Sequence, residues 1–235
     1  AAAHRLDQAG VPFVIFEKNA EVGGTGWENR YPGCRVDVPN HLYSYSFAQT
    51  DEWPSYYSPQ EVLLDYFRSC AEHFALRDRI RFETEVLGAD WDEAKQCWVL
   101  RVAARDGAAE RHEFQALVSA VGQLNRPKFP DIPGRDRFEG PSFHSARWDD
   151  SVELAGKRVA VIGTGASAAQ FIPYVAATAG ELVVFQRTPP WLLPVPNYQD
   201  ELPAGVRWLL RHVPNYARWN RLWIFWRMHE GLLPA

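Results

Sequence analysis

Six consecutive residues, G-T-G-A-S-A at positions 163–168, have the spacing of a turn that binds the pyrophosphate of a dinucleotide. Gly163 would make the tight turn, and Gly165 would let backbone N–H groups approach the phosphates. Ala168 is small enough for close helix–strand contact, and the N-terminus of the helix adds partial positive charge. The turn lies between a predicted strand (157–162) and a predicted helix (to about 179), so we expect a complete nucleotide-binding β-turn-α-β unit.

Arg187 follows the next predicted strand, residues 181–186. An acidic residue at this place would bind the free ribose 2′-hydroxyl of NAD, whereas an arginine accommodates the 2′-phosphate of NADP. The alternative is an arginine that merely ends an exposed strand. We therefore predict that the cofactor of this unit is NADPH.

Glu17 ends another predicted strand, a buried parallel one over residues 11–17, which follows a helix over 1–9 and Gly10. An acid in this position of a Rossmann unit binds a ribose hydroxyl, and a glycine turn precedes the helix. Here that turn would lie before Ala1, so we expect the sequence to begin inside the first helix and to be a fragment at both ends. The alternative is that Glu17 is a solvated charge at the end of a strand.

The elements between these two units are predicted from turn residues and alternation. Glycines and prolines make 22–45 a long structured loop, and Ser58 caps a helix over 59–76. Further strands are expected at 80–86, 98–103, 110–114 and 116–121. The strands at 98–103 and 110–114 would be joined through Asp106-Gly107. We expect an α/β fold with two incomplete Rossmann-like domains: 1–124 for FAD, a proline-rich connection over 125–156, and 157–235 for NADPH.

Composition excludes several classes of function. The net charge of −4 gives no reason to expect nucleic acid as a partner. Three cysteines without a CxxC pair predict neither a disulfide framework nor a zinc or other metal site, and they favour a cytoplasmic location. No apolar run approaches the ~20 residues that span a bilayer.

Near the C-terminus, Tyr216, Trp219, Trp223 and Trp226 fall on one stripe of a predicted helix with arginines nearby. This pattern suits a helix packed on the nucleotide domain or shaping the substrate entrance. The alternative is a helix on a membrane surface, because basic residues beside tryptophan suit an interface. We favour the packed helix.

A further pattern identifies a family. Residues 138–148 read F-E-G-P-S-F-H-S-A-R-W, which resembles the F-x-G-x-x-x-H-x-x-x-W fingerprint of Baeyer–Villiger monooxygenases. The loop G-G-T-G-W-E-N-R-Y-P-G-C-R-V-D, G-T-G-A-S-A-A-Q and V-F-Q-R-T-P-P-W are similar to the same family, in the same order. The 4-hydroxyacetophenone monooxygenase type is the nearest variety. Gly26 departs from the family, which usually has tryptophan there, and Asp149 replaces the commoner proline.

The resemblance implies cofactors, chemistry and roles for single residues. NADPH would reduce FAD, O₂ would add at flavin C4a, and the resulting peroxide would convert a ketone, possibly an aromatic one, into an ester or lactone. The arginine that stabilises this peroxide would lie beyond residue 235, positioned by Asp37. His144 would organise or hinge the connection rather than abstract a proton, and Trp148 marks the subtype. The FAD-binding residues implied are Glu17, Thr25, Trp27, Arg35, Asp37, Tyr43, Val86 and Gln123. Those implied for NADPH are Gly163, Thr164, Gly165, Ala166, Ser167, Ala168, Gln170, Gln186 and Arg187.

Two rivals stand beside this hypothesis. Flavin monooxygenases that oxygenate nitrogen or sulfur usually end the fingerprint in Tyr or Phe, so Trp148 argues against them. The other rival is a non-catalytic nucleotide-binding module, because the glycine turn for FAD and the oxyanion-stabilising arginine are absent from this sequence.

Overall fold

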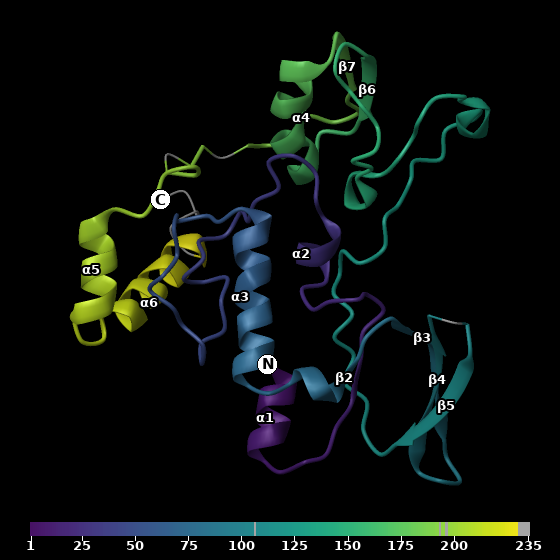
Figure 1. Ribbon diagram of the computed structural model, residues 1–235, viewed down its shortest axis with the longest axis vertical. Helices are drawn as coiled ribbons and strands as arrows, with labels where there is room; N and C mark the ends of the chain where they lie inside the picture. The colour runs from purple at the N-terminus through teal and green to yellow at the C-terminus, as the bar shows by residue number, and fades with distance from the viewer. Residues whose placement is uncertain (106, 193, 196, 230–235) are drawn as a thin grey trace. The chain divides into compact units, whose positions relative to one another are not determined.

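A computed structural model describes residues 1–105, 107–192, 194–195 and 197–229 (Figure 1). The chain divides into two compact units. The first contains residues 1–28 and 64–130, and the second contains 29–63 and the chain from 131 onward. The structure thus groups segment 29–63 with the second unit, whereas the sequence placed it in the FAD-binding domain.

The first unit opens with a helix and a short parallel strand pair. Helix α1 (Ala2–Gln8) ends before Gly10, whose φ of 66° suits glycine. Strand β1 (Ile15–Phe16) pairs in parallel with β2 (Ile80–Arg81), which follows the 3-10 helix η1 (Arg77–Arg79). The predicted strand over 11–17 is parallel, as expected, but it is only two residues long.

The same unit contains an antiparallel sheet of order β3-β4-β5, formed by β3 (Thr84–Asp92), β4 (Cys97–Ala104) and β5 (Ala109–Phe114) (Figure 1). The central strand alternates as a half-buried strand should: Leu100 and Val102 are buried while Arg101 is exposed. The predicted strand over 80–86 is split into β2 and β3 because Glu83, between them, adopts φ 51°. Asp106, part of the predicted turn, lies outside the described residues.

The strand predicted over 116–121 is wrong. The structure assigns no strand there, and Val118 and Val121 are 63% and 69% exposed. An apolar run forms a stable strand only when a neighbour satisfies its backbone hydrogen bonds. In the described part of the chain, no strand pairs with this segment.

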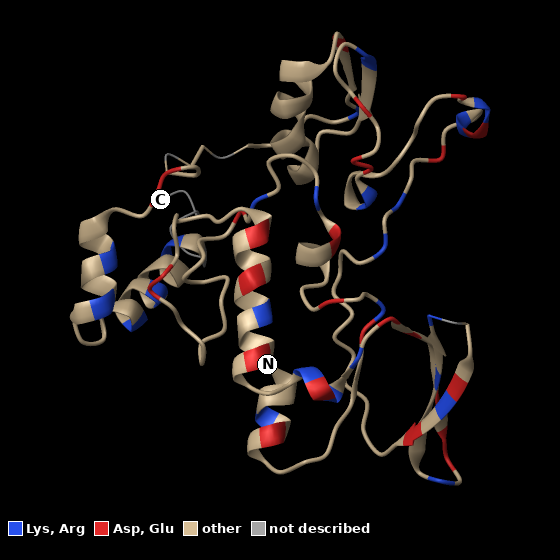
Figure 2. Ribbon diagram, viewed as in Figure 1, with Lys and Arg blue, Asp and Glu red and all other residues tan. Residues whose placement is uncertain are grey.

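Helix α3 (Gln60–His73) is amphipathic, and it confirms the predicted helix over 59–76. Its charged residues recur every three or four positions (Figure 2), which places them on one stripe: Glu61, Asp65, Arg68 and Glu72. Leu63, Leu64 and Ala71 on the other side are buried. Ser58, just before the helix, accepts a 2.6 Å hydrogen bond at Oγ from Asn40 Nδ2.

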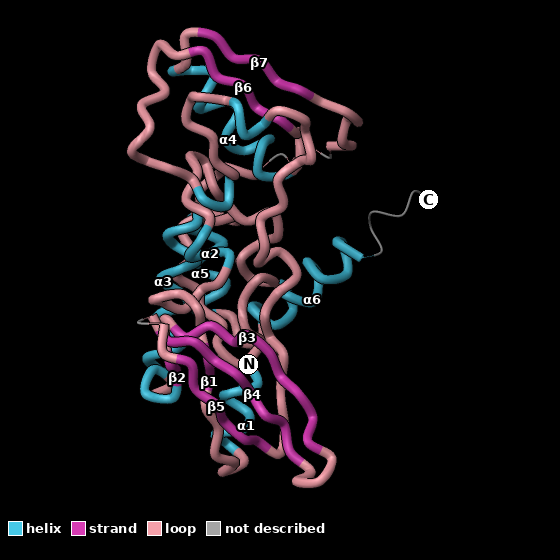
Figure 3. Tube along the Cα trace, turned by 90° about the vertical axis from the view of Figure 1, so that its right-hand side faces the viewer, coloured by secondary structure: helices cyan, strands magenta, loops and turns pink. Residues whose placement is uncertain are grey.

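The second unit contains the β-α-β arrangement that the sequence predicts. Strand β6 (Arg158–Ile162) leads into α4 (Ala166–Thr178), and β7 (Glu181–Phe185) returns in parallel to β6, with Ala160 opposite Val183. Figure 3 shows the two strands side by side. One buried cluster of this unit lies between α4, β6 and the loop after residue 29, and comprises Tyr31, Val161, Ala168, Phe171 and Val175.

The second unit contains four further helical elements. The 3-10 helices η2 (Arg135–Arg137) and η3 (Ser145–Arg147) lie in the connection, and α5 (Ala204–His212) precedes α6 (Tyr216–His229). The predicted aromatic stripe is helical, and Trp219 and Trp223 of α6 stack at 6.0 Å. Trp219, Trp223 and Trp226 are 62%, 47% and 54% exposed, so the expectation that this stripe packs on the nucleotide domain is wrong. Arg221 donates from α6 to the carbonyl oxygens of His41 (2.6 Å) and Ser44 (3.0 Å), so α6 is anchored within its unit.

In the described part of the chain, no helix combines the length and the apolar character that crossing a membrane requires.

Candidate functional site

The turn between β6 and α4 is open to solvent where a pyrophosphate would lie. Gly163 has φ 105°, which only glycine adopts easily, and Gly165 is the extended N-cap of α4. A Cβ built on either glycine meets no atom within 4 Å. No side chain caps the helix at Gly165, so the first N–H groups of α4 are left for a ligand.

The end of β7 lies beside this turn. Gln186 Nε2 donates to Thr164 Oγ1 at 3.0 Å, which ties the residue after β7 to the glycine turn. Arg187 follows directly and is exposed. The open turn, the uncapped helix and the adjacent arginine together fit a phosphorylated dinucleotide such as NADP.

Glu17 lies directly after β1 in the first unit and is half-buried. Its Oε1 accepts a 2.8 Å hydrogen bond from the backbone N–H of Asn19, and its own N–H donates to the carbonyl of Arg81. The carboxylate is therefore held at the carboxyl end of a parallel strand, where an acid can accept hydrogen bonds from a ribose.

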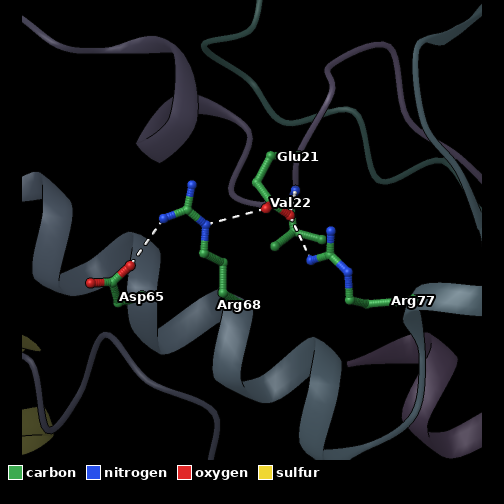
Figure 4. Close-up of polar contacts among 5 residues, drawn as sticks. All are labelled: Glu21, Val22, Asp65, Arg68 and Arg77. Atoms are coloured by element: carbon green, nitrogen blue, oxygen red, sulfur yellow. Dashed lines mark hydrogen bonds and ion pairs between the residues drawn. The ribbon is translucent and has the colours of Figure 1, made fainter.

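The glycine-rich loop that begins at Val22, here called the glycine loop, is held by the half-buried carboxylate of Glu21 (Figure 4). Glu21, with a side chain 14% exposed, accepts hydrogen bonds from Arg77 Nη1 (2.8 Å) and Arg68 Nε (3.2 Å) and from the N–H of Val22 (2.9 Å). Burial by itself raises the pKa of Glu21, but these hydrogen bonds outweigh it and the pKa is lowered. Asp65 also contacts Arg68, so the cluster joins the loop to α3.

Thr25 and Trp27 lie in α2 (Thr25–Glu28), a four-residue helix inside the loop that the sequence predicted to lack helices. Arg68 lies over the Trp27 ring at 5.7 Å. Gly23 permits this arrangement: its φ is 120°, and a Cβ there would lie 2.7 Å from Leu64 Cδ1. The loop is thus a fixed structure in which Thr25 and Trp27 have defined places.

In the second unit, Arg35 is surrounded by carbonyl oxygens and aromatic rings. Its Nη1 donates to the carbonyls of Tyr57 (2.9 Å) and Tyr198 (3.0 Å). Its backbone N–H and C=O are both bonded to Gln170. Asp37, two residues on, is exposed.

Gln170, which the family resemblance assigns to NADPH, bonds in this structure to a loop far away in sequence. All four of its hydrogen bonds are made to protein groups, the side-chain amide being bonded to Tyr31, Arg35 and Tyr198. These bonds use both its oxygen and its NH₂ group. The Gln170 side chain therefore orders this loop, and its contact with NADPH stays a prediction.

The fingerprint residues pack against the second unit. Trp148 contacts Phe171 of α4, with ring centroids 5.3 Å apart, and Phe143 at the same distance. His144 Nδ1 accepts from the N–H of Ala146 at 3.1 Å and begins η3. Burial, and then the charge of Arg147, lower the pKa of His144. Trp148 is thus a packing residue of the core rather than an exposed catalytic group.

The remaining predicted residues are exposed and fall in both units. Val86 on β3 is 41% exposed and Gln123 is exposed, both in the first unit, and Tyr43 in the second is 44% exposed. The first unit therefore contains Glu17, Thr25, Trp27, Val86 and Gln123 of the predicted site. The second contains Arg35, Asp37, Tyr43, both fingerprint residues and the glycine turn.

Comparison with known proteins supplies the family. The model of the family described as flavin-binding monooxygenase-like matches residues 15–206. The chain belongs to the flavin-binding monooxygenase-like family. This match includes the glycine loop, the fingerprint and the whole β6-α4-β7 unit.

Several relatives of this chain are named as monooxygenases. It is 47% identical over 230 residues to a Baeyer–Villiger monooxygenase of Streptomyces coelicolor, covering 97% of this chain and 43% of that one. It is similar to the closed crystal structure of cyclohexanone monooxygenase (TM-score 0.81, 35% identity, 94% of this chain and 41% of that one). It is also similar to OTEMO in complex with FAD and NADP (TM-score 0.79, 38% identity, 87% and 39%). The chain spans 36–43% of the length of the curated relatives that it matches.

Sequence reasoning missed the residues that support the candidate site. Arg68 and Arg77 lie 47 and 56 residues from Glu21, and Tyr31 lies 139 residues from Gln170. No local spacing pairs residues so far apart. The one available signal was the half-polar face of α3, which places Arg68 in line with Asp65.

Proposed function

We propose that this chain is part of a Baeyer–Villiger monooxygenase that uses NADPH, FAD and O₂ to convert a ketone into an ester or lactone. The observation that carries the proposal is the open glycine turn of β6-α4 beside Arg187, in the same unit as the packed fingerprint. Relatives named for this reaction and for complexes with FAD and NADP support it. In balance, ketone, O₂, NADPH and H⁺ give ester, water and NADP⁺.

The glycine turn would bind NADPH. The N–H groups at Ala166, Ser167 and Ala168 would face the pyrophosphate at the N-terminus of α4, whose partial positive charge favours phosphate. Thr164 and Gln186 would fix the turn to β7 through their 3.0 Å hydrogen bond. The Arg187 guanidinium would bind the 2′-phosphate, which is the basis for preferring NADPH over NADH.

Residues of the first unit would bind FAD. Glu17 would accept hydrogen bonds from the ribose, and Thr25 and Trp27, held in place through Glu21 and the Arg68–Trp27 contact, would line the flavin. Bound FAD would supply the electron transfer from NADPH and the activation of O₂. Val86 and Gln123 would complete its surroundings in the first unit. Arg35 and Tyr43 are proposed as FAD-binding residues on the family resemblance alone.

Asp37 would hold the positive group that stabilises the oxyanion formed during attack on the ketone, an electrostatic role. His144 and Trp148 would position the connection and not transfer a proton: His144 accepts a hydrogen bond from its own turn, and Trp148 is packed on α4.

The functional domains would be an FAD-binding part over 1–124, a connection over 125–156 and an NADPH-binding part from 157. Within the ketone class we propose an aryl ketone, on the resemblance to the 4-hydroxyacetophenone type. Free thiols at Cys34, Cys70 and Cys97 support a reducing, cytoplasmic setting.

The test is an assay of ketone-dependent NADPH oxidation by the full-length protein, with an aryl and a cyclic ketone, and with product mass measured. Formation of an ester or lactone in step with NADPH consumption is expected. NADPH consumption that yields hydrogen peroxide and no ester with any ketone would contradict the proposal.

A further inference from the structure

A single amide joins the helix of the glycine turn to a loop far away in sequence. Gln170, the fifth residue of α4, accepts at Oε1 from Tyr31 Oη (3.1 Å) and from the backbone N–H of Arg35 (3.2 Å). Its Nε2 donates to the carbonyl of Arg35 (2.9 Å) and to Tyr198 Oη (2.9 Å). Tyr31, at the start of loop 31–37, and Arg35, in its middle, are therefore both bonded to the Gln170 side chain.

Tyr31 extends this connection to the glycine turn itself. Its side chain is 6% exposed and its ring packs edge-on against Phe171 of α4 at 5.8 Å. Burial raises the pKa of Tyr31, and a hydrogen bond with Ser167 opposes that shift. Ser167 lies in the first turn of α4, three residues before Gln170. The Tyr31 phenol therefore contacts both the start of this helix and the Gln170 side-chain amide.

Beyond Gln170 the connection continues to Asp37. Arg35 is fixed on both sides, by Gln170 at its backbone and by the carbonyls of Tyr57 and Tyr198 at its guanidinium. The guanidinium also lies 5.8 Å from the centroid of the Tyr198 ring. Asp37 lies two residues after Arg35 in the same loop, so the position of its backbone depends on where Arg35 is held.

We propose that Gln170 is a positioning residue that couples occupancy of the pyrophosphate turn to the order of loop 31–37. The inference rests on the proposed NADPH site. A ligand that bonds to the N-terminal N–H groups of α4 holds the first turns of the helix, and therefore Tyr31 and Gln170, in place. Loop 31–37, with Arg35 and Asp37, becomes more ordered as a result, without itself touching the pyrophosphate. The pyrophosphate turn and loop 31–37 would then influence each other by a coupling free energy.

Hydrogen exchange of the full-length holoenzyme, measured by mass spectrometry with and without NADP⁺, tests the proposal. In the unaltered protein, NADP⁺ slows exchange at 163–170 and also at 31–37, the latter by about fivefold, the lower end of typical coupling between linked sites. In Gln170→Leu the effect at 163–170 remains and the effect at 31–37 is lost. A merely structural role would speed exchange at 31–37 equally in both states and leave the NADP⁺-dependent difference unchanged.

Two variants keep the test decisive. Tyr31→Phe removes the hydrogen bonds of the phenol to Gln170 and to Ser167 but keeps the buried ring, so it folds and shows a reduced NADP⁺ effect at 31–37. Gln8→Leu makes the same chemical change on exposed helix α1, where Gln8 contacts Arg5, and changes neither segment.

The outcomes are distinguishable. If NADP⁺ protects 31–37 equally in Gln170→Leu and in the unaltered protein, the coupling role of Gln170 is wrong while the NADPH site stands. If NADP⁺ protects neither segment in the unaltered protein, the proposed NADPH site itself is wrong, and the coupling proposal fails with it.

Discussion

The indole of Trp148 packs against the ring of Phe171, with centroids 5.3 Å apart and ring planes at 54°. Trp148 ends the fingerprint and Phe171 lies in α4, the helix that begins at the glycine turn. The fingerprint is therefore fixed to the core of the second unit by an aromatic contact. This packing explains why position 148 is a tryptophan.

Trp148→Ala should destabilise the protein by about 2–4 kcal/mol, somewhat below the loss for a fully buried tryptophan, because Trp148 is only partly buried. Chemical denaturation measures the free energy of unfolding. Trp191→Ala is the matched control: Trp191 is 100% exposed, so its loss should stay within about 0.5 kcal/mol. Equal losses for the two variants would show that the Phe171 contact has no special weight.

His144→Ala should lower the turnover number while leaving the FAD content unchanged. The imidazole accepts a hydrogen bond from the N–H of Ala146, so its removal loosens η3 and the connection that carries Trp148. Steady-state kinetics and the flavin absorbance of the purified holoenzyme measure the two quantities. An unchanged turnover number would refute the organising role.

Gly165→Ala separates folding from cofactor binding. The backbone at Gly165 is extended and a Cβ meets no protein atom within 4 Å, so the melting temperature should be unchanged. The same methyl group lies where the pyrophosphate approaches, so the KM for NADPH should rise roughly tenfold or more. Gly163→Ala is the contrast: φ is 105° there, so this variant should also lose about 1–2 kcal/mol of stability. An unchanged KM in Gly165→Ala would remove the pyrophosphate from this turn.

Arg187→Ala should raise the KM for NADPH and leave the KM for NADH almost unchanged. A lost charge-assisted hydrogen bond is worth about 1.5–3 kcal/mol, or roughly ten- to a hundredfold. Arg158→Ala, an exposed arginine on β6 that pairs with Glu181, is the control and should alter neither KM. A parallel rise for both nucleotides would mean that Arg187 does not contact the 2′-phosphate.

His41 makes stability depend on pH. The ring is 3% exposed, and neither ring nitrogen has a hydrogen-bond partner among the described residues. Burial, and then the charge of Arg221, lower the pKa of His41 to about 4 from 6.5. The unfolded chain therefore binds a proton more readily. Stability is fully present above pH 6.5, and as the pH falls toward 4 it declines by about 3 kcal/mol at most.

His41→Leu should flatten this decline, as measured by denaturation between pH 7 and 4. The variant removes the titrating group and both unpaired nitrogens. His212→Leu on exposed helix α5 is the matched control and should leave the decline in place. An identical pH profile in His41→Leu would assign the decline to other groups.

Local patterns predicted the parts of the fold that depend on neighbours in sequence. The glycine turn, α3 and the β6-α4-β7 unit follow from turn residues and periodicity, and all three are confirmed. The strand over 116–121 failed because its stability depends on a partner strand. The contacts of Gln170 with Tyr31 and Arg35 could not be predicted because both partners come from a loop 135 or more residues away.

The most direct measurement of the central claim is the fate of isotopically heavy O₂ in the reaction of the full-length protein with NADPH and a ketone. The account predicts that the ester or lactone gains one heavy oxygen atom, that the other appears in water, and that one NADPH is consumed for each product molecule. An ester without heavy oxygen, or NADPH oxidation with all the heavy oxygen in hydrogen peroxide, would contradict it.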